Sequence, residues 1–72
     1  MKTCYALISS FVNGTVTARS EISLFPSIEL AQVVGDKIKE ENSDLWTVFN
    51  RIEKVYYYET LAEVPIMQEH VN

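Results

Sequence analysis

Residues 3–25 read TCYALISSFVNGTVTARSEISLF, and this stretch decides the fold. Asn13-Gly14 lies midway between two runs in which apolar and polar residues alternate. Asn-Gly tolerates the positive φ that a type I′ turn needs at both central positions, and the twist of this turn matches that of the flanking strands. The stretch therefore predicts a β-hairpin with strands over residues 3–12 and 15–24.

A turn centred on Asn13-Gly14 also predicts how the two strands pair. Val12 should face Thr15 and Phe11 should face Val16, so that one face of the hairpin collects the mostly apolar set Tyr5, Leu7, Ser9, Phe11, Val16, Ala18, Ser20, Ile22 and Leu24. On the opposite face the first strand is mostly apolar, and the second is polar at Thr15, Thr17, Arg19, Glu21 and Ser23. A strand that is apolar on both sides is usually central, whereas a strand with one polar side suits an edge. We therefore expect the first strand in the middle of the sheet.

A helix is predicted over residues 28–41. Ser27 is placed to cap its first turn, Glu29 lies where a negative charge is favoured, and Asn42 suits the C-terminal cap. One side of the predicted helix is apolar and carries Leu30, Ala31, Val34, Gly35 and Ile38. Gly35 weakens helix propensity, which predicts that the helix approaches the sheet closely at this point. The helix is expected on the face with Tyr5, Leu7, Phe11 and Val16.

Residues 45–58 fit two descriptions. The apolar residues recur at helical spacing, but Trp46-Thr47-Val48-Phe49 and Val55-Tyr56-Tyr57-Tyr58 are the β-branched and aromatic runs typical of strands. A lone hairpin is marginal in water, so a third strand is favoured, with a kink, tight turn or second hairpin near Asn50-Arg51. The prediction is a single α+β domain, residues 1–72, of ββαβ type with antiparallel sheet order 2-1-3 and an irregular tail over 60–72. The alternative is ββαα.

The formal charge of the 72 residues is -4, and from Asp36 onward eight acidic residues face four basic ones. Phosphate-backbone binding draws its affinity from clustered Lys and Arg, so direct binding of nucleic acid is not expected. The acidic half has two interpretations. It is either a solvated surface or the mark of a small inhibitor that mimics nucleic acid and binds the basic site of a larger protein.

The residues offer little for catalysis or for cofactors. Cys4 and His70 are the only cysteine and histidine, which are too few for a structural zinc site, and nothing in the sequence brings them together. No run approaches the roughly 20 apolar residues of a membrane span. One cysteine allows no internal disulfide, which favours a cytoplasmic setting. We expect no enzyme activity, no cofactor, no metal, no small-molecule ligand and no membrane contact.

The remaining function class is protein binding. One helix covers one face of a three-stranded sheet, which leaves the second apolar side of the first strand without cover. Tyr, Trp and Phe are also frequent anchors of protein interfaces. The predicted interface consists of the open sheet face and three exposed tyrosines, and its partner is either a second copy, as a homodimer, or another protein. Its residues are Cys4, Ala6, Ile8, Val12, Tyr56, Tyr57 and Tyr58.

Overall fold

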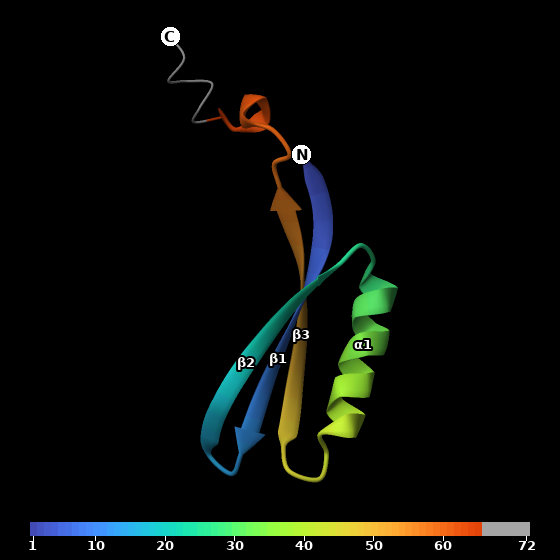
Figure 1. Cartoon of the computed structure of the whole chain (residues 1–72), viewed down its shortest axis with the longest axis vertical. Coiled ribbons are helices and arrows are strands. Elements are labelled where there is room, and N and C mark those ends of the chain that lie inside the picture. The colour runs from blue at the N-terminus through green and yellow to red at the C-terminus, as the bar shows by residue number, and fades with distance from the viewer. Residues whose placement is uncertain (66–72) are drawn as a thin grey trace.

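The structure is a computed structural model that describes residues 1–65. It contains the strands β1 (Lys2–Asn13) and β2 (Val16–Phe25), the helix α1 (Ile28–Glu41), the strand β3 (Thr47–Tyr57) and a short 3₁₀ helix, Leu61–Glu63. The strands form one antiparallel sheet in the order β2-β1-β3, and α1 lies along one face of it (Figure 1). The predicted ββαβ fold with β1 in the centre is confirmed.

Strand β3 is continuous. It pairs with β1 from Lys2 opposite Tyr57 to Val12 opposite Thr47 without any shift in register. The tight turn that the sequence suggested near Asn50-Arg51 is absent. The β-branched and aromatic residues therefore outweigh the helical spacing of the apolar positions, because the central strand needs a second neighbour for its backbone hydrogen bonds.

The hairpin turn differs from the prediction by one residue. Asn13 and Val16 are the last residue of β1 and the first of β2, so the two-residue loop is Gly14-Thr15. Gly14 has a φ of 65°, and no non-glycine residue in the described part of the chain has a positive φ. A glycine with positive φ at the first central position is the pattern of a type II′ turn, so the predicted type I′ turn is wrong.

A β-bulge then changes the register a second time. Val12 pairs with Thr17, but the preceding residue of β1, Phe11, pairs with Arg19, so Ala18 is the extra residue of the bulge. From there Ile8 faces Ile22. Along this part of β2 the observed pairing with β1 is displaced from the predicted pairing by three residues, which is an odd number. The side chains of residues 19–24 therefore lie on the face opposite to the predicted one.

Helix α1 begins and ends where the sequence predicts. The Ser27 hydroxyl accepts a hydrogen bond from the backbone N–H of Leu30 at 3.2 Å, and Glu29 lies in the first turn. At the other end the Asn42 side-chain amide donates to the Ile38 carbonyl at 2.7 Å. The Ser27 hydroxyl thus pairs a backbone N–H that has no partner within the helix, whereas the Asn42 side chain adds a second hydrogen bond to a carbonyl that already accepts the Asn42 backbone N–H.

The core lies between α1 and the middle of the sheet. Its buried residues on the helix side are Leu7, Ser9, Phe11, Val48, Ala31 and Gly35. The Phe11 ring meets the Trp46 ring edge-on at a centroid distance of 6.5 Å, and the Arg19 guanidinium lies over the Phe11 ring at 4.4 Å. Val16 was expected under the helix but is exposed, because it pairs with Asn13 beside the turn.

A polar junction joins the helix to the sheet at Gly35. The Asn50 side-chain amide donates to the Gly35 carbonyl at 2.8 Å, and the buried Ser9 hydroxyl donates to the Asn50 side-chain oxygen at 2.7 Å. A Cβ on Gly35 would lie 3.1 Å from the Asn50 amide nitrogen and 3.2 Å from a Leu7 methyl carbon. The expected close approach at Gly35 is confirmed, and it lets Asn50 hydrogen-bond both layers.

Candidate protein interface

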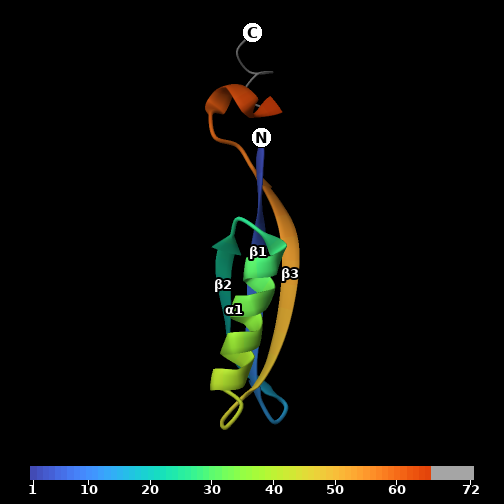
Figure 2. The ribbon, with the colours of Figure 1, turned by 90° about the vertical axis from the view of Figure 1, so that its right-hand side faces the viewer.

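The face of the sheet opposite α1 has no covering element among residues 1–65 (Figure 2). Directly paired residues of an antiparallel sheet point to the same side, so the register identifies the side chains on this face. We call it the uncovered face. It carries Lys2, Cys4, Ala6, Ile8, Ser10 and Val12 from β1, Thr17, Ser20, Ile22 and Leu24 from β2, and Thr47, Phe49, Arg51, Glu53, Val55 and Tyr57 from β3.

Large apolar side chains on the uncovered face are in contact with solvent. Ile22 is 67% exposed, Leu24 63% and Phe49 60%. The other side of β2 carries polar residues at positions 19, 21 and 23. Strand β2 therefore has one polar side and one apolar side, as the sequence predicts, but its apolar side faces away from the helix.

The four β1 residues predicted for the interface all lie on the uncovered face. Cys4, Ile8 and Val12 are half-buried. Ala6 is only 5% exposed because its neighbours across the strands, at positions 24 and 53, are both larger. They lie on the side of β1 that α1 does not cover, and their role in an interface stays a prediction.

The three tyrosines do not form one surface. Tyr57 pairs with Lys2 and lies on the uncovered face, whereas Tyr56 points to the helix side. There the Lys54 ammonium lies 5.6 Å from the centre of the Tyr56 ring. Tyr58 follows the end of β3. All three tyrosines are exposed, but only Tyr57 is continuous with the predicted β1 residues.

Sequence reasoning missed four apolar members of this face: Ile22, Leu24, Phe49 and Val55. The first two were assigned to the core by the wrong register. A signal was present, since both alternate with polar residues along β2, but the bulge at Ala18 hides which side the alternation faces. The positions of Phe49 and Val55 depend on the register between β1 and β3, which no short-range pattern specifies.

Two hollows border the uncovered face. The larger, about 400 Å³, is beside the end of β2, where β2 stops opposite Tyr5 while β1 and β3 continue (Figure 1). It is lined by Thr3, Cys4, Leu24, Phe25, Pro26, Val55 and Tyr57. The smaller, about 360 Å³, is lined by Ile8, Ser10, Ser20, Phe49, Asn50 and Arg51. The larger hollow is mostly apolar, and the smaller is about half polar.

An ion pair lies at the β3 edge of the uncovered face, about halfway along the strand. The Arg51 guanidinium is 3.1 Å from the Glu53 carboxylate, and the two residues are neighbours on the same side of β3. Both side chains are exposed, so the pair adds little to stability. It nevertheless places a positive and a negative charge side by side along the strand direction.

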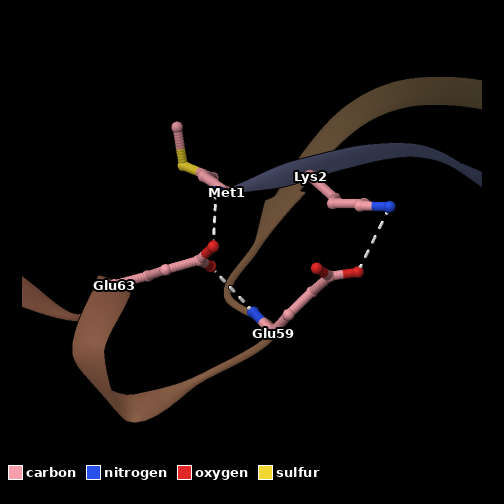
Figure 3. Close-up of polar contacts among 4 residues, drawn as sticks. All are labelled: Met1, Lys2, Glu59 and Glu63. Carbon is pink, nitrogen blue, oxygen red and sulfur yellow. Dashed lines mark hydrogen bonds and ion pairs between the residues drawn. The ribbon is translucent and has the colours of Figure 1, made fainter.

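A second group of charges joins the beginning of β1 to the 3₁₀ helix (Figure 3). The Glu63 carboxylate lies 3.1 Å from the N-terminal ammonium and accepts a hydrogen bond from the Glu59 backbone N–H at 3.0 Å. The Lys2 ammonium is 3.4 Å from the Glu59 carboxylate. The hydrogen bond from Glu59 and the N-terminal ammonium together lower the pKa of Glu63 below its ordinary value of 4.5.

The contacts of Glu63 are predicted to depend on pH. Because the folded-state pKa is lowered, they are present at neutral pH and are lost as the pH falls through that lowered value. Glu63→Ala removes both carboxylate oxygens and should release the contact at every pH, which should speed hydrogen exchange at the Glu59 amide. Glu40→Ala, a change on an exposed helix residue, should leave that amide unchanged. Equal exchange at Glu59 in all three proteins would contradict the contact.

The structure describes only one of the two residues considered for nucleophilic chemistry. Cys4 is half-buried on the sheet, and His70 lies outside the described residues. Among residues 1–65, no three His, Cys, Asp or Glu side chains cluster closely enough to hold a metal ion. The described acidic residues are divided between β2, α1, the turn after it, β3 and the contacts at the N-terminus. No helix within that range is long and apolar enough to span a membrane.

Fold and face together define a small two-layer α+β protein in which one helix covers one side of a three-stranded sheet and leaves the other side largely apolar. The chain matches no family model, no curated protein and no solved structure. Its function is therefore argued from the geometry of the uncovered face.

Proposed function

We propose that this chain is a non-enzymatic protein-interaction module that binds a protein surface through its uncovered face. The observation that supports the proposal is the exposure of Ile22, Leu24 and Phe49 on one side of the sheet. Burial of a large apolar side chain contributes about 1.5–3 kcal/mol, so the exposed part of each of these three still offers about 1–2 kcal/mol. Contiguous apolar surface of this kind usually marks an interaction site.

The shape and charge of the face favour a protein as the ligand. Its hollows are open and spread over three strands, whereas small-molecule sites enclose most of their ligand. Its basic residues, Lys2 and Arg51, lie far apart along the sheet and are each paired with a glutamate, so the face has no cluster of cations for phosphate groups. Phe49 and Tyr57 are aromatic residues of the type that anchors protein interfaces.

The proposal predicts different behaviour for two equally exposed apolar residues. Ile22 lies on the uncovered face, and Val33, which is 65% exposed, lies on the outer side of α1. Ile22→Glu should abolish binding, because it places a charge in an apolar contact. Val33→Glu should leave binding intact. Binding is measured as self-association in sedimentation equilibrium and as capture of cellular proteins on the immobilised chain, with circular dichroism to confirm folding.

The same pair of variants discriminates the alternative of an acidic inhibitor. Contacts of the uncovered face are mainly apolar and should weaken little with added salt. A mimic of nucleic acid should instead lose its partner sharply as salt rises, and both variants should bind that partner equally well at low salt. Identical binding by Ile22→Glu and Val33→Glu would overturn the proposed function.

A further inference from the structure

We propose that the partner of the uncovered face is a second copy of this chain, related to the first by a twofold axis that runs across the strands at Leu7. This inference rests on the proposed function and specifies its partner. Two independent features of the face, its charge pair and its larger hollow, select this arrangement. In it the two sheets lie face to face, with their strands antiparallel apart from the angle that sheet twist imposes.

The residues of the face are arranged in rows across the strands. Ile8 pairs with Ile22 and Arg51, and the next row on the same side joins Ala6 to Leu24 and Glu53. Leu7 lies between these two rows on the opposite side of β1. A twofold axis across the strands at Leu7 therefore exchanges the two rows between the copies, and Ile22 of one copy meets Leu24 of the other.

The charge pair distinguishes this axis from the alternative. An axis across the strands places β3 over β3, so Arg51 of each copy faces Glu53 of the second copy, and each charge gains a second opposite charge. An axis along the strands would instead place β3 over β2 and bring Arg51 and Glu53 against Ile22 and Leu24. Charges buried against apolar side chains are costly. The first axis is therefore favoured.

The same axis brings Phe49 to the larger hollow. Phe49 belongs to the row of Ser10, which the axis exchanges with the row of Cys4 and Val55. Cys4 and Val55 line the hollow of about 400 Å³ beside the end of β2. The exposed ring of each copy thus reaches an apolar hollow in the other. The same axis therefore pairs the opposite charges of the two copies and places each Phe49 ring at a hollow of the other copy.

The size of the face suits a dimer of moderate affinity. The rows from Lys2 to Val12 span about 33 Å, and three strands are up to about 14 Å wide, which gives a projected area of roughly 460 Å² per copy. Standard interfaces bury about 800 Å² of accessible surface per partner. Accessible surface follows the contours of the side chains, so it is larger than the projected area of the same face. We therefore expect a dissociation constant in the micromolar range, roughly 1–100 μM.

Charge reversal tests the arrangement directly. Arg51→Glu sets two carboxylates against each other across the interface, and Glu53→Arg sets two guanidinium groups against each other. Each variant alone should self-associate roughly tenfold to a hundredfold more weakly than the unchanged chain. An equimolar mixture of the two variants restores opposite charges at every contact, so mixed dimers should form with nearly the original affinity. Sedimentation equilibrium gives the mass, and labelling one variant with a fluorophore identifies the mixed species.

Phe49→Ala adds a test of the hollow. It should weaken self-association about 30-fold, because it removes an aromatic anchor from a pocket. Failure of the mixture to associate, or an unchanged chain that stays monomeric throughout the micromolar range, would overturn the dimer. If that monomer still captures a cellular protein that Ile22→Glu does not, the proposed function survives with a different partner. If Ile22→Glu captures that protein equally well, both the dimer and the proposed function are wrong.

Discussion

Phe11→Ala is expected to lower the free energy of unfolding by about 3–5 kcal/mol, whereas Phe49→Ala should lower it by about 1 kcal/mol or less in the monomer. The two phenylalanines are in neighbouring strands, and the substitution is the same. Phe11 is buried between the sheet and α1, with Trp46 and Arg19 against its ring. Removal of its ring leaves a cavity that the surrounding side chains cannot fill. Phe49 leaves no cavity, because its ring faces solvent.

Urea unfolding followed by the fluorescence of Trp46 measures both variants. The samples must be dilute, since association of folded chains adds apparent stability by mass action. If Phe11→Ala lowers the free energy of unfolding no more than Phe49→Ala does, the core does not lie where the register places it. In Phe49→Ala, the dependence of the unfolding midpoint on protein concentration should begin at concentrations about 30-fold higher than in the unchanged chain.

Asn50→Ala is expected to destabilise the chain by about 2–4 kcal/mol. The substitution removes the hydrogen bond to the Gly35 carbonyl, which contributes about 0.5–1.5 kcal/mol, and it leaves the buried Ser9 hydroxyl without its partner, which costs about 1–3 kcal/mol. The effect is large for a surface strand residue because Asn50 connects the buried hydroxyl of β1 with the backbone of α1.

A double-mutant cycle separates these contributions. In the unchanged chain, Ser9→Ala should be destabilising, since it removes one hydrogen bond. In the Asn50→Ala background the same change should be neutral or stabilising, because the hydroxyl it removes has no partner there. Equal effects of Ser9→Ala in both backgrounds would mean that Ser9 and Asn50 are not coupled. Chemical unfolding of the four proteins provides the required free energies.

The elements of this fold were predictable because their signals are local. Ser27 and Asn42 mark the ends of the helix by side-chain hydrogen bonds that span three or four residues. The order of the sheet followed from β1, since a strand that is apolar on both faces is usually central. These arguments depend on composition within short windows, and the structure agrees with them.

The pairing of β2 was not predictable in the same way. Asn13-Gly14 and Gly14-Thr15 are both acceptable two-residue loops, and they differ by one residue. The bulge at Ala18 then adds a second shift, and no residue type near it announces its position. Since side chains alternate at every residue, an error of this kind exchanges the two faces of the strand. Ile22 and Leu24 were therefore assigned to the core.

Only the β1 residues of the uncovered face were predicted from the sequence. Cys4, Ala6, Ile8 and Val12 lie opposite the helix whatever the register of the edge strands. The residues with the greatest exposure come from the edge strands and were missed, because their side depends on long-range pairing. The tyrosine run was recognised as exposed, but alternation along β3 divides it between the two faces.

The uncovered face is a direct consequence of the composition of the central strand. Strand β1 is apolar on both sides, and α1 covers one of them. Under the proposed function another protein surface buries the second side, and in the proposed dimer the opposite charges of Arg51 and Glu53 on β3 face those of the second copy. Structure and proposed function thus have the same origin in β1.

The most direct test of the uncovered face as an interface is a nuclear Overhauser measurement on a mixed sample, in which one half of the chains carries isotope-labelled methyl groups and the other half does not. We predict intermolecular cross-peaks between the Phe49 ring of one copy and the Val55 methyl groups of the other, at concentrations above the dissociation constant. Intermolecular cross-peaks to Val33 on the outer side of α1, with none on the uncovered face, would contradict this interface.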